Sequence, residues 1–371
     1  MAKKLISVWL VLTILLCSSI SIFAEETVTG TFFLRDIRIN GTQLRNYELN
    51  QPFFLHDGVT YVPMSKGIQD AMGLQCEMDW ESRTLKILKT DIVMGPVKDA
   101  DLASDMNDVQ ATIVEDVEVI TYTPEISHQV IYAQKHLAEL EEVQKSEEIK
   151  APVLVAHNLD LEGLPIMVSE DTLYLPLKAL TDDPNLGISI YYESYSGVYI
   201  STDHFVDAKD FWDEEASNYN KGLVSYIMVC NKNLSVAQAQ ELVSMFQHEA
   251  KIYGLDEKLL MAIAHKESTF NVNLGRSGKA QGLMQIMPKT AAGFGVEEWQ
   301  LYDPHVSVKL ACTLMTGHLK AYDNNMVIAL SAYNQGSGRV NRGNYTTTYA
   351  NKILDQKAKI EAYLVNNGFV Q

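Results

Sequence analysis

The chain reads LDEKLLMAIAHKES from residue 255 to residue 268, and this stretch predicts a helix that ends beside a single acid. Asp256 is a suitable N-cap for such a helix. Leu260, Ile263 and Glu267 follow at i, i+3 and i+7, which places all three on one face. Glu267 therefore continues the apolar stripe of its helix instead of the solvent-exposed face.

The position of Glu267 has a chemical consequence. A carboxyl group on a buried stripe loses hydration, which disfavours its charged form and raises its pKa. A general acid that works near neutral pH requires such a shift. The alternative is a glutamate at a helix end that simply turns to solvent.

Two later segments carry side chains suited to a sugar. Residues 282–288 read GLMQIMP, in which the amide of Gln285 can donate and accept hydrogen bonds at once. Such an amide suits a sugar hydroxyl, an N-acetyl group or the acid itself, although Met-rich runs also pack in cores. Tyr333 and Asn334 place an aromatic face beside an amide, an arrangement that can stack and orient a pyranose ring.

Five blocks of sequence, taken together, resemble the soluble lytic transglycosylase domain. This family has a lysozyme-like fold and cuts the glycan strands of peptidoglycan. The resemblance covers residues 236–363. The matching blocks are Glu267-Ser268, residues 280–291 (AQGLMQIMPKTA), Tyr302-Asp303-Pro304, residues 332–340 (AYNQGSGRV) and Thr348-Tyr349.

The resemblance implies a role for each matched residue. Glu267 would be the sole catalytic acid and base, and Ser268 would support the helix end beside it. Met284 and Gln285 would line the cleft, with Tyr333 and Asn334 across from them and Tyr349 closing one wall.

The chain departs from the family pattern in one place. The family usually has Ser-x-x-Gly-Ala before Gly-Leu-Met-Gln, whereas residues 276–280 read RSGKA here. Ser277 arrives one residue late and Lys279 replaces the glycine. Ser277 is the candidate for contact with the acetamido group of the substrate.

The matched blocks offer one carboxylate, whereas ordinary glycosidases need two, about 5 Å apart or about 6.5–9.5 Å apart. Asp303 is interpreted as a turn residue, and Glu297 and Glu298 as surface residues. The resemblance implies that Glu267 protonates the glycosidic oxygen and then takes the C6 hydroxyl proton, which closes a 1,6-anhydro ring. The alternatives are a hydrolytic muramidase on the same fold and a non-catalytic peptidoglycan-binding protein.

The first 24 residues indicate a secretory signal peptide. Lys3 and Lys4 precede an apolar run over residues 5–17, and Ala24 suits cleavage. A secreted, extracellular or wall-associated protein follows, with an uncleaved membrane anchor as the alternative. Cys76, Cys230 and Cys312 remain after cleavage, which argues against a disulfide framework. No Cys/His cluster has metal-ligand spacing, so we expect neither a metal nor a cofactor.

Charge is distributed unevenly along the chain. The formal net charge is −17, yet residues 241–371 hold 13 basic and 11 acidic side chains. Residues 25–240 hold 15 basic and 36 acidic side chains, which argues against nucleic acid. The near-neutral part is suited to approach anionic peptidoglycan strands, and the acidic part predicts a solvated spacer or a wall or protein contact.

The N-terminal half contains an internal repeat of α+β type. Residues 37–41 echo residues 159–163, residues 60–64 echo 173–177, and residues 84–88 echo 197–201. The pattern resembles the stalk domain named after the N-terminal domain of copper amine oxidases, and it implies a spacer or a wall-binding role. Nothing here offers copper ligands.

The expected organisation is α+β overall, with a repeated, β-rich stalk followed by a mainly α-helical, lysozyme-like domain. The stalk is expected over residues 25–203, with an acidic insertion at about 97–150 that contains an exposed helix over 126–148. Residues 204–235 are interpreted as a packed linker, and residues 236–371 as the lysozyme-like domain.

Overall fold

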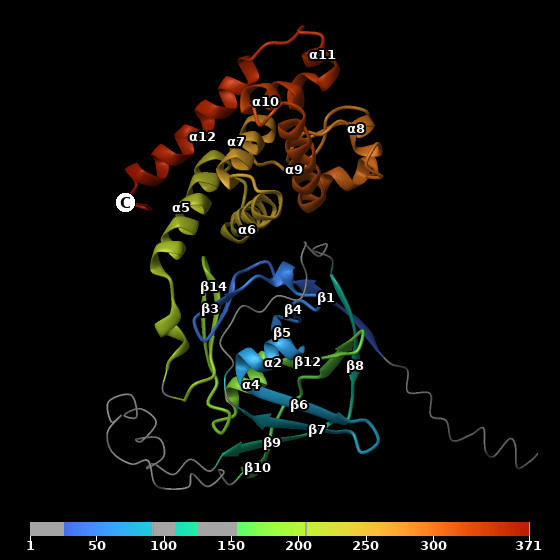
Figure 1. Ribbon diagram of the computed structural model, residues 1–371, viewed down its shortest axis with the longest axis vertical. Helices are drawn as coiled ribbons and strands as arrows, with labels where there is room; N and C mark the ends of the chain where they lie inside the picture. The colour runs from blue at the N-terminus through green and yellow to red at the C-terminus, as the bar shows by residue number, and fades with distance from the viewer. Residues whose placement is uncertain (1–25, 91, 93–107, 125–153, 205, 371) are drawn as a thin grey trace, which may run out of the picture.

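The computed structural model describes residues 26–90, 92, 108–124, 154–204 and 206–370 (Figure 1). The expected signal peptide, much of the acidic segment and the helix expected over residues 126–148 lie outside these residues. In the described part no helix has the length and apolar character needed to cross a membrane. Cys76, Cys230 and Cys312 are free thiols there.

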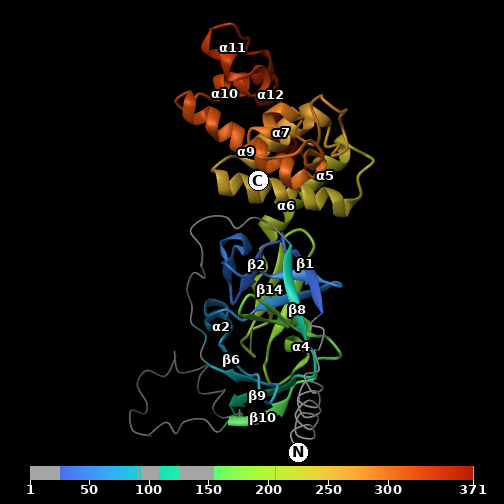
Figure 2. The same ribbon diagram turned by 90° about the vertical axis from the view of Figure 1, so that its right-hand side faces the viewer.

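Strands dominate the first half of the described chain, and helices dominate the second, so the predicted mixture of helix and strand is confirmed. The two parts lie end to end along the long axis of the molecule (Figures 1 and 2). The strands are β1 (Thr27–Phe32), β2 (Ile37–Ile39), β3 (Thr42–Leu44), β4 (Phe54–His56), β5 (Val59–Pro63), β6 (Leu74–Asp79), β7 (Thr84–Lys89), β8 (Val109–Val114), β9 (Glu118–Pro124), β10 (Leu154–Asn158), β11 (Ile166–Ser169), β12 (Thr172–Pro176), β13 (Ser189–Glu193) and β14 (Gly197–Ser201). The short helices among and after them are η1 (Asn46–Glu48), α2 (Lys66–Met72), α4 (Leu177–Asp182) and η2 (Ala208–Phe211).

The strands form two intertwined copies of one unit. A closed barrel has the strand order β1-β4-β5-β12-β11-β8, and two further sheets have the orders β10-β9-β7-β6 and β13-β14-β2-β3. Exchanging β1–β7 with β8–β14 reproduces all three orders. The last strand of each copy pairs in parallel with the second strand of the other, as β7 with β9 and β14 with β2. Neither copy can therefore complete its sheets alone.

This topology changes one expected boundary and one expected correspondence between the repeats. Residues 109–124 fall inside the expected acidic insertion, yet they form β8 and β9, which begin the second copy. The topological equivalent of β2 is accordingly β9, whereas residues 159–163, expected to match β2, lie after β10. Local sequence similarity could not show this because the equivalence is set by pairing between distant strands.

Alternating side chains of the strands fill two separate apolar clusters. Phe53 packs in a cluster with Ile68, Leu85 and Ile200. The next residue, Phe54, faces the opposite side and packs with Tyr174, whose ring centroid lies 4.7 Å away. Successive residues of an extended chain point to opposite faces, so one short segment contributes to both clusters.

The side chain of Asn46 holds the backbone at Phe53 in place through hydrogen bonds. Its side-chain amide donates to the carbonyl oxygens of Phe33 at 2.9 Å and Phe53 at 2.8 Å. Its oxygen accepts from the Phe53 amide at 2.6 Å. Asn46 is buried, so water cannot replace these hydrogen bonds if the side chain is removed.

The helical part has one continuous core. Its elements are α5 (Glu214–Cys230), α6 (Val236–Tyr253), α7 (Glu257–Ser268), α8 (Pro288–Ala292), η3 (Glu298–Tyr302), α9 (Pro304–Ala321), α10 (Met326–Gln335), α11 (Ser337–Asn341) and α12 (Thr348–Asn366). Leu223 and Ile227 of α5 lie in this core together with Phe246 of α6 and Leu364 of α12. The segment interpreted as a linker, residues 204–235, thus includes a helix that is part of the helical core.

The two parts meet through charged and polar contacts. Arg38 of β2 pairs with Asp213, the N-cap of α5, at 3.0 Å. Gln240 of α6 accepts a hydrogen bond from Arg35 and donates one to the Ser194 carbonyl, both at 3.3 Å. These contacts place α6 against the strand part, with its opposite face in the helical core.

We expect Asn46→Ala to lower the free energy of unfolding by about 2–4 kcal/mol, because it leaves buried backbone groups of Phe33 and Phe53 without a partner. Urea unfolding followed by circular dichroism measures the change. The control is Gln75→Ala at an exposed position of β6, for which we expect a change within about 0.5 kcal/mol. Equal effects of the two substitutions would contradict this role of Asn46.

Candidate active site

Helix α7 carries Glu267 in its last turn. The side chain of Asp256 accepts a hydrogen bond from the Lys258 amide and caps the N-terminus, as predicted. The helix ends because Thr269 has φ 51°, and its amide closes onto carbonyls of the preceding turn. The interior of α7 is apolar and buried, so the helix holds the backbone of Glu267 in a fixed place.

Glu267 is partly buried and hydrogen-bonded to one tyrosine. The Tyr349 hydroxyl donates to Oε1 of Glu267 at 2.6 Å. Burial raises the pKa of Glu267, while the Tyr349 hydrogen bond and the charge of Lys266 act in the opposite direction. The net pKa is higher than that of an ordinary glutamate, which favours the protonated form that a general acid needs.

Two tyrosines, buried Tyr349 and partly buried Tyr333, respond to the same carboxylate. Burial raises the pKa of Tyr349 and of Tyr333, and the negative charge of Glu267 raises both further. Each tyrosine therefore keeps its proton and remains a hydrogen-bond donor. Tyr349, Tyr333 and Glu267 come from α12, α10 and α7, so the site depends on the packing of three helices.

Ser268 joins the helix end to the segment that follows it. Its hydroxyl lies 3.1 Å from the Ala264 carbonyl and 2.7 Å from the Leu283 carbonyl. The next residue, Met284, receives two further contacts: its amide donates to Ser307 Oγ at 3.1 Å, and its carbonyl accepts from Tyr333 at 3.1 Å. The backbone at Leu283 and Met284 is thereby fixed beside the acid.

The side chain of Met284 differs from the expectation that it lines a cleft. It is fully buried and packs in the helical core. Its backbone, not its thioether, takes part in the site. The short spacing between Gly282 and Gln285 cannot show which way each side chain turns, so this outcome needed the structure.

Position 282 requires a glycine because its backbone lies close to the backbone of Leu301. Gly282 has φ 73°, and a Cβ there would lie 1.8 Å from the Leu301 carbonyl oxygen. Gln285 also has a positive φ, 48°, and its side-chain Nε2 donates to the carbonyls of Leu274 at 2.8 Å and Gly282 at 2.9 Å. Gln285 thus secures the turn that presents Met284.

Asn334 and Ser277 lie farther out. Asn334 is exposed near the C-terminus of α10, directly after Tyr333. Ser277 is exposed in the loop before Gly282, and its hydroxyl contacts Glu298. The contacts of the described residues do not bring Ser277 to Glu267.

Glu298 has a structural role that the sequence did not indicate. Its Oε1 accepts hydrogen bonds from the Gly278 amide at 2.8 Å and from the buried Gln281 side chain at 2.5 Å. These bonds lower the pKa of Glu298 and tie the loop of Ser277 to η3. The interpretation of Glu298 as a surface residue missed this contact, because no local pattern links residues 278 and 298.

In the described part, the groups that shift the pKa of Glu267 are Tyr349 and Lys266, neither of which is a carboxylate. Asp303, interpreted as a turn residue, caps α9 by accepting from the His305 amide at 2.8 Å. Within the described residues, no group of three or more His, Cys, Asp or Glu side chains could hold a metal ion.

A helical core that carries one partly buried glutamate at a helix end is the arrangement expected of a lysozyme-like domain. Residues 244–355 match the family model described as the transglycosylase SLT domain. The predicted resemblance is therefore confirmed for this segment, which contains Glu267, Tyr333 and Tyr349. The resemblance of the strand part to a copper amine oxidase stalk domain stays a prediction.

Several proteins are similar to part of this chain. A transglycosylase of Enterobacteria phage PRD1 is 33% identical over 102 residues, which cover 28% of this chain and 37% of the phage protein. The soluble lytic murein transglycosylase of Salmonella typhimurium is 33% identical over 104 residues, which cover 26% of this chain and 16% of that protein. The chain thus spans well under half the length of these relatives.

The chain is also similar in part to the crystal structure of the 70 kDa soluble lytic transglycosylase from Escherichia coli. The likeness covers 41% of this chain and 30% of that one, at 21% identity and a TM-score of 0.31. A likeness this distant adds nothing to what the sequence match supports.

We expect Glu267→Gln to stabilise the protein at neutral pH. Unfolded glutamate has a pKa of about 4.3, and burial raises the pKa of Glu267 in the folded state. The folded protein therefore binds more protons between these two values, and the free energy of unfolding falls as pH rises through that window. Glutamine does not ionise, so the Glu267→Gln protein does not lose this part of its free energy of unfolding as pH rises.

Urea unfolding at pH 7 and below about pH 4 measures the effect, with the stabilisation present at pH 7 and smaller in acid. Exposed Glu241→Gln on α6 is the matched control, for which we expect a change within about 0.5 kcal/mol. A destabilised Glu267→Gln protein at pH 7 would show that the ionised carboxylate is favoured in the fold.

Proposed function

We propose that the helical part cleaves the β-1,4 bond between N-acetylmuramic acid and N-acetylglucosamine in peptidoglycan, as a lytic transglycosylase. The observation that carries the proposal is the partly buried Glu267, hydrogen-bonded to Tyr349 inside a segment that matches the SLT family model. The names of the similar proteins, which include lytic murein transglycosylases, support the same substrate class.

The proposed reaction uses Glu267 twice. In its protonated form it gives its proton to the glycosidic oxygen, and the bond to the leaving sugar breaks. The acetamido oxygen of the substrate supports the developing positive charge. Glu267, now ionised, accepts the proton of the muramic C6 hydroxyl while that oxygen attacks C1, which yields a 1,6-anhydro end and returns Glu267 to its protonated form.

Tyr349 and the fixed backbone at Met284 assist these steps. The Tyr349 hydroxyl donates to the carboxylate and stabilises it between the two proton transfers. Tyr333 and Ser268 hold the chain at Met284 and Leu283, so that the walls beside the acid do not shift. Exposed Asn334 and Ser277 remain candidates for contact with the glycan.

The hydrolytic alternative would need a group that activates water. Ordinary glycosidases use a second carboxylate for this purpose or as the nucleophile. The groups that act on Glu267 in the described part are a tyrosine and a lysine, which favours the anhydro-forming reaction. A non-catalytic binding protein would have no use for a carboxyl group with a raised pKa.

The proposal extends to the rest of the chain. We take residues 1–24 as a secretory signal, so that the enzyme acts outside the cytoplasm on the wall. We take the strand part as a stalk that holds the enzyme, and its acidic composition as a solvated surface or a partner contact.

Mass spectrometry of muropeptides released from intact sacculi by the full chain tests the reaction. We expect products lighter by one water than reducing-end muropeptides. The rate of the Glu267→Gln protein should be about 10²–10⁴-fold lower, because this is the usual contribution of a general acid and base. Reducing-end products would mean a hydrolase, and unchanged release by Glu267→Gln would falsify the assigned role of Glu267.

Tyr349→Phe should move the alkaline limb of the pH profile of kcat/KM to higher pH. The substitution removes the hydrogen bond that lowers the pKa of Glu267, so that Glu267 stays protonated to a higher pH. Turbidity assays on purified walls at a series of pH values measure the limb. Tyr345→Phe, four residues earlier, is the control. An alkaline limb that stays in place, or moves to lower pH, would contradict the role of Tyr349.

A further inference from the structure

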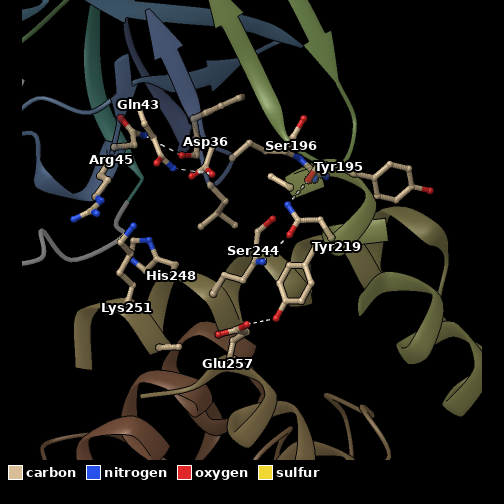
Figure 3. Close-up of a pocket in the computed structure, with 18 of the residues that line it drawn as sticks. Asp36, Gln43, Arg45, Tyr195, Ser196, Tyr219, Ser244, His248, Lys251 and Glu257 are labelled. Carbon is tan, nitrogen blue, oxygen red and sulfur yellow. Dashed lines mark hydrogen bonds between the residues drawn. The ribbon is translucent and has the colours of Figure 1, made fainter. Parts of the chain in front are cut away.

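A cavity of about 440 Å³ lies between the strand part and the helical part (Figure 3). The turn after β1 and the strand β3 form one wall, with Asp36, Gln43 and Arg45. Helix α6 forms the opposite wall, with Ser244 and Lys251. A volume of this size falls within the range of small-ligand sites, about 300–1,000 Å³.

The cavity is lined by charges of both signs. Asp36 and Lys251 influence each other electrostatically, yet within the described residues they form neither an ion pair nor a hydrogen bond with each other. The Asp36 carboxylate accepts a hydrogen bond from the Gln43 side chain at 3.1 Å on Oδ2. Arg45, on the same side of the cavity as Lys251 in Figure 3, is also paired with Glu48 at 2.9 Å.

Asp36 and Lys251 are both exposed, so a ligand in the cavity can reach them, although the surrounding protein removes part of their hydration. Burial raises the pKa of Asp36 although Lys251, Arg38 and Arg45 oppose the shift. Burial also lowers the pKa of Lys251, and the charge of Arg45 adds to this effect. Both groups would gain from a ligand that brings the opposite charge to each of them.

Other polar groups of the cavity already have partners. Asn220 donates to the Tyr195 carbonyl at 2.6 Å and accepts from Gln247 at 2.7 Å. Tyr219 donates its hydroxyl to Glu257. These contacts fix the cavity walls that α5, α6 and α7 contribute. Asp36 and Lys251 lie on opposite walls of the same cavity.

We propose that this cavity binds a zwitterionic amino-acid group, with its ammonium against Asp36 and its carboxylate against Lys251 and Arg45. A neutral sugar would leave both charges uncompensated. A polyanion such as a nucleotide would meet the carboxylates of Asp36 and Glu257. A group that carries one charge of each sign matches the cavity.

Two sources offer this chemistry: a free amino acid and the diamino acid of a peptidoglycan stem peptide. The second source rests on the proposed function. The cavity is separate from the acid, because Glu257, in its wall, begins α7, and Glu267 follows ten residues later. That separation is about 15 Å along the helix axis. The cavity therefore belongs to substrate or ligand recognition and not to the bond-breaking step.

Isothermal titration calorimetry on the full chain with Glu267→Gln tests the proposal, because binding is then measured without cleavage. The probes are an L-alanyl-γ-D-glutamyl-diaminopimelate tripeptide and free diaminopimelate. Asp36→Asn and Lys251→Gln, each added to this background, should weaken binding at least about ten-fold. The matched controls are Asp57→Asn and Lys86→Gln, both exposed and away from the cavity.

A third variant, Ser244→Tyr, fills the cavity without changing its charge and should also weaken binding at least about ten-fold. Binding of the tripeptide alone identifies the stem peptide as the source, and binding of both probes shows that the free amino acid suffices. The proposal is overturned if neither probe binds at about 10 mM, which corresponds to less than about 3 kcal/mol of binding free energy. Equal binding by the cavity variants and their controls also overturns it. Neither result depends on whether the helical part cleaves glycan.

Discussion

The hydrogen bond from Tyr349 to Glu267 is the interaction on which the candidate site depends. It joins the end of α7 to the beginning of α12, two helices that are far apart in sequence and packed together in the core. Burial raises the pKa of the Glu267 carboxyl, and the Tyr349 hydrogen bond lowers it. Tyr349 thereby helps the partly buried Glu267 carboxyl to exist in both its protonated and its ionised form. A residue that gives a proton and later takes one back needs both forms.

Helix α7 relates this site to the rest of the molecule. Its C-terminal turn carries the acid, and its N-terminal turn carries Glu257 in the wall of the cavity beside the strand part. Helix α6 packs beside α7 and contacts the strand part through Gln240. The junction is therefore continuous with the core that positions Glu267, and the strand part is more than a separate appendage. Its two copies are intertwined through parallel strand pairs, which makes it a single unit on which the helices rest.

Features set by neighbouring residues could be predicted from the sequence, and features set by distant pairing could not. The N-cap at Asp256, the helix that follows and the place of Glu267 on its buried side depend on residues within a few turns. The assignment of β8 to the second copy depends on its pairing with β1 and β11, which no local pattern contains. The contacts of Glu298 with Gly278 and Gln281 could not be predicted from the sequence for the same reason. At Met284 the motif was recognised, but the direction of the side chain was not, because turn geometry at Gly282 and Gln285 decides which groups face the core.

A titration of the Glu267 carboxyl by ¹³C nuclear magnetic resonance tests the account most directly, with the Glu267→Gln protein used to assign the signal. We expect a midpoint above the value of about 4.3 for an unperturbed glutamate, because burial outweighs the Tyr349 hydrogen bond and the Lys266 charge. A midpoint at or below that value would mean that Glu267 is ionised at neutral pH in the free protein. It could not then serve as the proton donor that begins the proposed reaction.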